Sequence, residues 1–487
     1  MPAIITSKFR VHNSEQFRES FTESAGNTYY LSIGRPQPFT TYTRGDGRSD
    51  NEGTDSAPIT PSDTENTQNF TYNDMLAAKK IDSSNVSIVI PRRNWTTGTV
   101  YDYYRHDYGV YLTGTTTNNV SNSSATLLSD ATFYVLTSAR NVYKCLDNNN
   151  NAASTVEPTG TSTSILSLAD GYKWKYMYTL SASQQANFLS TDFMAVETNS
   201  SVSSAAIDGA INIVKIKTAG SGGTDGTFTN IPIRGDGVNG TATVVVTSGA
   251  VSSVTVTNVG SGYTFATIGN AQIVSAGSTN LVGAELDCII EPKGGHGFNA
   301  VEELGGFFIM LNTSLEGTES ANTGDVTVAN DFRKVALLKD PKSGGSAASA
   351  TTLRATKAIK ITGASGTFAA DEKITQSGTN AVGKVVEWDS TNKILFYIQT
   401  RFSNEGVDAN GNKTAFSAGN TITGATSSAT GTPDTSHTAT TNNVVFSSGY
   451  SSAEIDAGSG QILYVENRAP ITRAADQTEN IKLIVEF

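Results

Sequence analysis

Four histidines are the side chains of this chain best suited to proton transfer or metal binding. They are His12, His106, His296 and His437, and no two of them stand four residues apart. A zinc site or a nucleophile–base pair needs such groups to be brought together, and the sequence contains no HExxH, CxxC, P-loop or GxSxG pattern. The scattered histidines therefore favour ordinary structural positions.

The segment around His296 still holds several reactive side chains. His296 stands in EPKGGHGF, with Asp287 and Cys288 shortly before it, and these could be imagined as a nucleophile–base pair or a metal cluster. Glu302 and Glu303 are adjacent in sequence, which places them on different sides of the chain and suits a solvated loop better than paired acids. We expect a loop histidine, no catalytic, cofactor-binding or metal residues, and a protein that is not an enzyme.

An aromatic stripe runs through residues 170–180. Tyr172, Trp174, Tyr176 and Tyr178 share one strand face, and lysines stand between them. Such a stripe could be a platform for stacking sugars or bases. In a strand it is more typical of the core of a β-sandwich, and a core position is what we expect here.

Two adjacent arginines follow a hydrophobic strand. Arg92 and Arg93 come shortly after residues 86–90. Their forked guanidinium groups could anchor a protein partner through paired hydrogen bonds. They could equally brace their own loop, and the sequence leaves both possibilities open.

The last 27 residues contain two alternating strands joined by a charged segment. Apolar residues alternate with polar ones at 461–465 and again at 481–487, the pattern of half-buried strands. Pro470 imposes a bend between them, since it cannot sit inside a central strand. The charge of this segment is concentrated in Arg468, Arg473, Asp476 and Glu479.

This ending resembles the C-terminal end of the baseplate wedge protein eight family of T-even-type contractile-tail phages. The matching residues are Tyr464, Glu466, Asn467, Arg468, Pro470, Ile471, Asp476, Gln477, Thr478, Glu479 and Phe487. Further segments near the N-terminus follow in the family's order: Ile5–Arg10, Leu31–Phe39, Val89–Trp95, Val142–Asp147 and Asp170–Leu180. No part of the chain between about residues 205 and 445 resembles the family.

The resemblance implies a structural subunit of the tail baseplate. In that family two copies associate within each wedge, hold neighbouring wedge proteins together and contribute to the rearrangement before sheath contraction. It implies other wedge proteins and a second copy of the chain as partners, and a place in the virion tail baseplate after synthesis in the bacterial cytoplasm. The residues expected at, or supporting, subunit interfaces are Arg92, Arg93, Trp95, Arg468, Arg473, Asp476 and Glu479.

Two rival functions remain open. A host-glycan-binding tail adhesin would use the aromatic stripe and the β modules, but the trimer-forming heptads or collagen-like stretches expected of it are absent from the sequence. A glycan-degrading tail enzyme would need a pair of carboxylates across a cleft, which the sequence cannot place.

Composition agrees with a large β protein. Only 16% of the 487 residues are charged, 45 are glycine, and the formal charge is 34 − 45 = −11. This acidic balance argues against nucleic acid as a partner. The absence of an apolar run near 18 residues argues against a membrane span. Cys145 and Cys288 lie far apart in sequence, and we favour two reduced, buried thiols over a disulfide bridge.

The expected fold is mainly β and multi-domain, with β-sandwich-like layers and a few short helices. Helices are expected from Asn13, where Asn13 and Gln16 form a capping-box pattern, at residues 71–80 and at residues 181–189, and a hairpin at residues 382–400. Two small β modules are expected as insertions. The expected boundaries are 1–205 for the N-terminal core, 206–275 for the first module, 276–345 for a return to the core, 346–357 for a Gly/Ser/Ala linker, 358–441 for the second module and 442–487 for the C-terminal strands.

Overall fold

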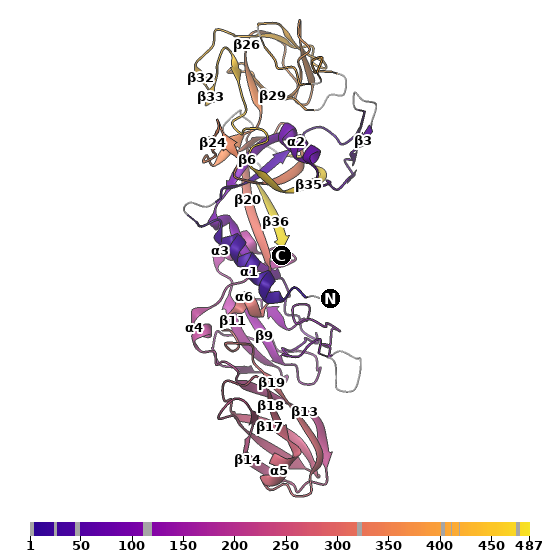
Figure 1. Cartoon of the computed structure of the whole chain (residues 1–487), viewed down its shortest axis with the longest axis vertical. Coiled ribbons are helices and arrows are strands. Elements are labelled where there is room, and N and C mark those ends of the chain that lie inside the picture. The colour runs from indigo at the N-terminus through magenta and orange to yellow at the C-terminus, as the bar shows by residue number, and fades with distance from the viewer. Residues whose placement is uncertain are drawn as a thin grey trace. The chain divides into compact units, whose positions relative to one another are not determined.

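Strands form most of the regular structure of the protein, which is given by a computed structural model (Figure 1). The structure describes residues 4–23, 27–43, 49–110, 119–318, 324–400, 405–410, 412–417, 419–473 and 478–487. The strands are arranged in several antiparallel sheets, and the helices are few and short. The expected mainly β fold class is confirmed.

The chain divides into two units, each built from segments that are far apart in sequence. The first unit comprises Met1–Phe17, Ser87–Met310 and Ile484–Phe487, and the second comprises Arg18–Val86 and Leu311–Leu483. The chain passes from one to the other inside four regular elements: α1 (Ser7–Glu19), β7 (Val86–Pro91), β20 (Phe308–Thr318) and β36 (Thr478–Glu486). The six boundaries expected from the sequence divide the chain differently and remain predictions.

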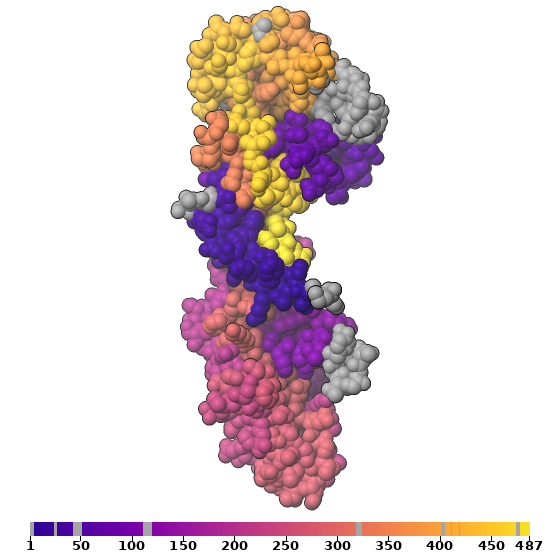
Figure 2. All heavy atoms as spheres, in the orientation of Figure 1, coloured from indigo at the N-terminus to yellow at the C-terminus, as the bar shows by residue number. Residues whose placement is uncertain are grey.

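The two ends of the chain meet in the first unit. The rings of Phe17 and Phe487 lie 5.5 Å apart, and the Arg10 guanidinium lies 3.5 Å from the centre of the Phe307 ring. In Figure 2 the yellow C-terminal residues lie against the indigo N-terminal residues. Helix α1 begins at Ser7, so the expected start at Asn13 is wrong. The physical reason is an earlier cap, because the Phe9 amide donates to Thr6 Oγ1 at 3.3 Å.

The aromatic stripe lies in a buried strand of the first unit. Strand β11 (Lys173–Thr179) pairs with β9 (Asn141–Asp147) in a sheet of order β10-β11-β9-β8, completed by β10 (Leu166–Ser167) and β8 (Tyr134–Leu136). Trp174 is fully buried, and the exposed fraction of the other aromatic residues of the stripe is 5% or less. The expected core position is confirmed, and the stripe offers no exposed stacking surface.

Two further sheets of the first unit enclose one core between about residues 211 and 288. One has the order β13-β19-β18-β15 and the other the order β14-β16-β17. These strands lie together with α5 in Figure 1, and their shared core includes Ile231, Val244 and Ile268. Their bounds are β13 (Ile211–Ser221), β14 (Gly226–Pro232), β15 (Arg234–Gly235), β16 (Thr241–Thr247), β17 (Ala250–Asn258), β18 (Ala266–Gly269), α5 (Asn270–Ser275) and β19 (Val282–Ile290).

The second unit contains a five-stranded sheet of order β25-β6-β1-β22-β35. Its strands are β1 (Tyr29–Gly34), β6 (Met75–Ile81), β22 (Phe332–Lys339), β25 (Thr352–Arg354) and β35 (Gln461–Ile471). The expected helix at residues 71–80 is wrong here, because α2 spans Glu65–Asp74 and the chain then continues as β6. Burial and pairing of β6 between β1 and β25 outweigh the helix preference of its alanines.

A seven-stranded sheet of order β29-β28-β27-β30-β31-β26-β34 completes the second unit. The expected hairpin is confirmed: β28 (Val382–Asp389) pairs antiparallel with β29 (Ile394–Ile398). The core of this sheet includes Ile359, Val385 and Ile422. The other strands are β26 (Lys357–Ser365), β27 (Lys373–Gln376), β30 (Ile422–Gly424), β31 (Thr430–Pro433) and β34 (Tyr450–Ser451).

The remaining elements are short. The expected helix near residue 181 is confirmed as α3 (Ala182–Phe188), capped by Ser181. The expected linker at 346–357 contains β24 and β25. The other short elements are β2 (Thr41–Thr43), β3 (Ser49–Asn51), β4 (Gly53–Thr54), β5 (Ala57–Pro58), η1 (Ser83–Asn85), β12 (Phe193–Ala195), α4 (Ser200–Ser204), α6 (Ala300–Glu303), β21 (Val326–Thr327), β23 (Lys342–Ser343), β24 (Ser346–Ala347), β32 (Thr440–Thr441) and β33 (Val444–Val445). Within the described residues, no helix combines the length and apolarity needed to cross a membrane.

Candidate functional site

The paired arginines predicted at an interface bond within the first unit. Both follow β7. The Arg92 side chain donates to Asn94 Oδ1 at 3.0 Å and to the Ser190 carbonyl at 2.7 Å. The Arg93 guanidinium donates to the main-chain carbonyls of residues 129–131 and lies 4.7 Å from the centre of the Tyr134 ring. Of the two possibilities left open by the sequence, these contacts favour bracing of the local chain.

Trp95 is also anchored inside the first unit. Its indole N–H donates to Ser154 Oγ at 3.1 Å. Its ring packs, half-buried, against the core that contains Tyr101 and Trp174. Trp95 therefore helps to stabilise the packing of the first unit.

The C-terminal set of predicted residues lies in the second unit. Arg473 and Glu479 are buried and paired, with Arg473 Nε 2.7 Å from Glu479 Oε1. Arg473 also donates to the Thr327 carbonyl. Arg468 and Glu479 line one pocket of about 410 Å³ beside β35 and β36. Asp476 lies outside the described residues. The structure thus brings Arg468, Arg473 and Glu479 to one region and places the set around Arg92 in the other unit.

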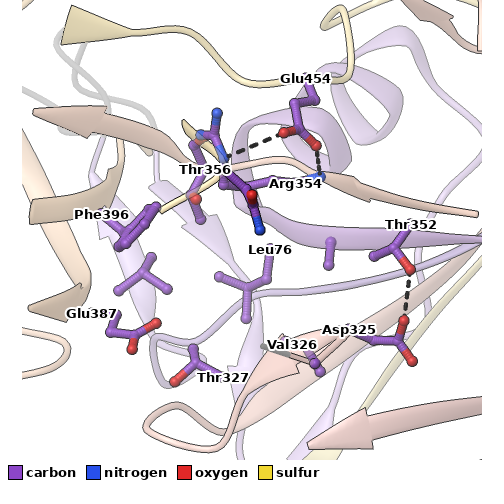
Figure 3. A pocket seen from close by; sticks show the side chains of 14 residues that line it. Leu76, Asp325, Val326, Thr327, Thr352, Arg354, Thr356, Glu387, Phe396 and Glu454 are labelled. Carbon is purple, nitrogen blue, oxygen red and sulfur yellow. Dashed lines mark hydrogen bonds and ion pairs between the residues drawn. The ribbon is translucent and has the colours of Figure 1, made fainter. Parts of the chain in front are cut away.

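A second pocket of the second unit lies between its two main sheets. It has a volume of about 200 Å³ and is lined by residues from β6, β21, β25, β28 and β29. Figure 3 shows Arg354 between Glu454 and Phe396. The Arg354 amide donates to Glu454 Oε2 at 2.9 Å, and its guanidinium donates to the Thr356 carbonyl and, at 2.9 Å, to the Ser452 carbonyl. Burial lowers the pKa of Arg354, and Glu454 opposes that change.

Glu387 is the titratable group of this pocket that changes charge near neutral pH. It lies beside Thr327 in Figure 3. Burial raises the pKa of Glu387 to about 7, and the charge of Asp389 adds to the effect. A carboxyl in this state loses its proton between mildly acidic and mildly basic conditions. The pocket can therefore link the stability of the second unit to pH.

A buried polar cluster in the first unit was not foreseen from the sequence. The Lys144 side chain is fully buried on β9, with Nζ 2.6 Å from Glu303 Oε2 and 2.7 Å from His296 Nδ1. Glu303 Oε1 accepts the Gly297 and Asn299 amides at 2.8 and 3.3 Å. The expectation of a solvated loop is wrong for Glu303, because α6 turns its side chain inward to this lysine.

The charges of this cluster are mutually compensated. Burial alone would raise the pKa of Glu303, but the Lys144 ammonium and the surrounding hydrogen bonds hold it at about 2. Burial, and then the Lys144 charge, lower the pKa of His296. Because His296 Nδ1 faces an ammonium donor, the imidazole is neutral and carries its proton on Nε2. His296 is therefore a buried structural residue, and the cluster resembles a core network more than a catalytic site.

The cysteines and metal-binding groups add no further site. Cys145 and Cys288 are both free and buried. Burial raises the pKa of both thiols, that of Cys288 to about 12, and a protonated thiol is a poor nucleophile. In the portion of the chain that the structure describes, no group of three His, Cys, Asp or Glu side chains is placed to hold a metal ion.

Comparison with known protein families finds one family whose model matches the two ends of the chain. The model of the family described as Bacteriophage T4, Gp8 matches residues 3–155 and 399–487. Over these two segments the chain is similar to the Phage-Gp8 family. The Gp8 match confirms the resemblance at both ends of the chain and supports a structural protein of the T4-type baseplate wedge. The match does not include Asp170–Leu180, and the expectation of no resemblance up to about residue 445 is wrong for residues 399–445. Residues 156–398 lie outside the Gp8 match, and a search of curated proteins finds no match to the chain.

Proposed function

We propose that this chain is a structural subunit of the tail baseplate wedge in a contractile-tail virion. It forms a homodimer, joins neighbouring wedge proteins and takes part in the baseplate rearrangement before sheath contraction. It is made in the bacterial cytoplasm, is not an enzyme and does not bind nucleic acid. The single observation that carries the proposal is the Gp8 family match at both ends of the chain.

Of the residues proposed for the interface, some contact a partner protein and others support the local structure. Arg468, half-buried at the pocket beside β35 and β36, is the charged residue of the C-terminal set best placed to touch a partner. Arg473 and Glu479 are buried against each other, so they hold the local structure that presents Arg468. Arg92, Arg93 and Trp95 support the first unit in the same way. Arginine at the centre of an interface is a frequent source of binding energy.

Immunogold labelling of purified virions with an antibody to this chain tests the location. We expect the label at the tail end, around the baseplate. Label at fibre tips, or none on the particles, would move the adhesin alternative ahead of the wedge function. Light scattering of the purified chain tests the dimer, which has twice the chain mass of 51.2 kDa.

Charge reversal at one residue tests the interface. Arg468→Glu should reduce co-purification with the other wedge proteins while thermal unfolding of the isolated chain stays unchanged. Arg18→Glu is the matched control, because Arg18 is an exposed arginine of the same unit. Equal co-purification of both variants would show that Arg468 is not at a subunit contact.

A further inference from the structure

One pocket of the first unit is lined by residues from inside and from outside the segments that match the family. It has a volume of about 490 Å³, within the range of roughly 300–1,000 Å³ typical of small-molecule sites. His106 and Tyr108 belong to the matched residues 3–155, whereas Asp208, Gly262 and Lys293 do not. A property of this pocket therefore belongs to this chain and not to the family as a whole.

Main-chain and side-chain hydrogen bonds hold the walls of this pocket in place. The Gly262 amide donates to the Asp208 carbonyl at 2.8 Å, and the Tyr263 amide donates to the Gly209 carbonyl at 3.1 Å. A side chain on Gly209 would meet the Tyr263 amide nitrogen at 2.5 Å, and its φ of +59° favours glycine as well. The Tyr108 hydroxyl, also in the lining, donates to the Tyr103 carbonyl at 2.8 Å. The pocket is consequently pre-formed.

The polar groups at the rim offer both donors and acceptors. His106 Nδ1 accepts the Ile290 amide at 3.3 Å, so the neutral ring carries its proton on Nε2 and can donate there. One oxygen of Asp208 accepts the Gly294 amide at 2.6 Å, and a carboxylate has a second oxygen to accept from a ligand. Lys293 is exposed at the same rim.

The charges of the pocket lining argue against an anionic ligand. Arg105 is compensated by Asp107 and Asp287, each at 2.8 Å. Lys293 then contributes one positive charge, and Asp208 and Glu291 contribute one negative charge each. The two oxygens of Glu291 already accept from the Asn212 side chain and the His296 amide. An anion would therefore face an excess of negative charge. A neutral molecule rich in hydroxyl groups can use the donors and acceptors together.

The remaining lining is apolar and partly aromatic. Tyr108, Leu128, Ile290 and Pro292 line the pocket, and Tyr108 and Leu128 are half-buried. Sugar rings have apolar C–H faces and a polar edge of hydroxyl groups, so they suit a site with an apolar wall and a polar rim. We propose that this pocket binds a neutral saccharide, with one pyranose ring against Tyr108 and Leu128 and its hydroxyl groups bonded to Asp208 and His106.

Saturation-transfer difference NMR on the full chain tests the proposal. The probes are glucose, galactose, mannose, N-acetylglucosamine and N-acetylgalactosamine, with inorganic phosphate as the anionic probe. We expect saturation of the ring protons of at least one sugar and no binding of phosphate, measured by its phosphorus linewidth. Asp208→Asn should weaken sugar binding about tenfold or more, because a hydrogen bond to a charged acceptor is lost.

Two further variants test whether the sugar binds at this pocket. His106→Ala should also weaken binding, whereas Lys217→Ala should not, because the Lys217 side chain is 70% exposed on β13 and does not line the pocket. Thermal unfolding of each variant checks that the fold is retained. No signal with any sugar, an equal signal in Asp208→Asn and the unaltered chain, or binding of phosphate in place of sugar would each overturn the proposal. The immunogold experiment on virions does not depend on sugar binding, so it tests the proposed wedge function separately.

Discussion

Replacing Glu387 by glutamine should remove a pH dependence from the stability of the second unit. Glu387 lines the pocket between the two main sheets of that unit. Burial raises the pKa of Glu387 from an ordinary value of 4.5 to about 7 in the folded protein. Between these values the folded state holds a proton that the unfolded chain has released. Folding is therefore favoured less as pH rises from 4.5 to 7, and the loss is complete above pH 7.

The size of the effect follows from the shift in pKa. A change from 4.5 to about 7 is about 2.5 pH units, and at about 1.36 kcal/mol per unit it corresponds to ~3.4 kcal/mol. Because Glu387 retains some exposure to water, screening reduces this to about 2–3 kcal/mol. Glutamine has a similar shape and cannot ionise, so Glu387→Gln should lack this contribution to the pH dependence between pH 5 and pH 8, while that of Asp371, whose pKa is raised to about 6, remains.

The assay is amide hydrogen exchange in β28 and β29 at increasing urea concentration, at pH 5 and at pH 8. Peptides from these strands report the free energy of opening of this unit separately from the other. We expect that free energy to fall by about 2–3 kcal/mol more in the unaltered chain than in Glu387→Gln. Glu316→Gln, at an exposed position of β20 in the same unit, should behave like the unaltered chain. The same pH dependence in all three proteins would refute the argument.

Three further substitutions test buried polar groups. Glu303→Gln leaves the Lys144 ammonium buried without its carboxylate and should cost about 3–5 kcal/mol in urea unfolding of the first unit. The same change at half-buried Glu302, whose partner Lys8 is exposed, should cost less than about 1 kcal/mol, and equal losses would contradict the buried pairing. Tyr263→Phe removes a buried hydroxyl that donates to one main-chain group and accepts from another. It should cost about 1–3 kcal/mol, and an unchanged midpoint of thermal unfolding would disprove those bonds. Arg473→Met should destabilise the second unit by about 3–5 kcal/mol in urea because its carboxylate partner stays buried; a fully stable variant that fails to assemble would instead make Arg473 a contact residue.

Strands marked by local sequence patterns were predictable. The stripe at Trp174 follows from the period-two spacing of its aromatic residues, and the hairpin of β28 and β29 follows from the turn at residues 389–392 between two strand-like segments. The same holds for α3, whose capping box is contained in four consecutive residues. Features of this kind depend on neighbours in sequence.

Features that depend on distant partners were not predictable in this way. Residues 75–81 carry helix-favouring alanines, yet they form β6 because two strands from elsewhere in the chain flank them. Glu303 turns inward only because Lys144, far away in sequence, supplies a buried charge. One signal did exist: Lys144 stands between Tyr143 and Cys145 in a strand that is buried on both faces. A lysine in such a strand requires an acidic partner.

The chain crosses between its two units four times, and these crossings affect the order in which the units can fold during synthesis. The first unit is completed by Ile484–Phe487, which leave the ribosome only after every residue of the second unit has been synthesised. The Phe487 ring lies tilted against the Phe17 ring, and the Phe487 amide donates to the Phe307 carbonyl at 3.0 Å. These residues therefore complete the packing of a unit that begins hundreds of residues earlier. Domains usually fold in the order of synthesis, but here the unit that starts first must finish last. A nascent chain halted inside the second unit lacks these contacts, so the first unit can complete its packing only after the second unit has been synthesised.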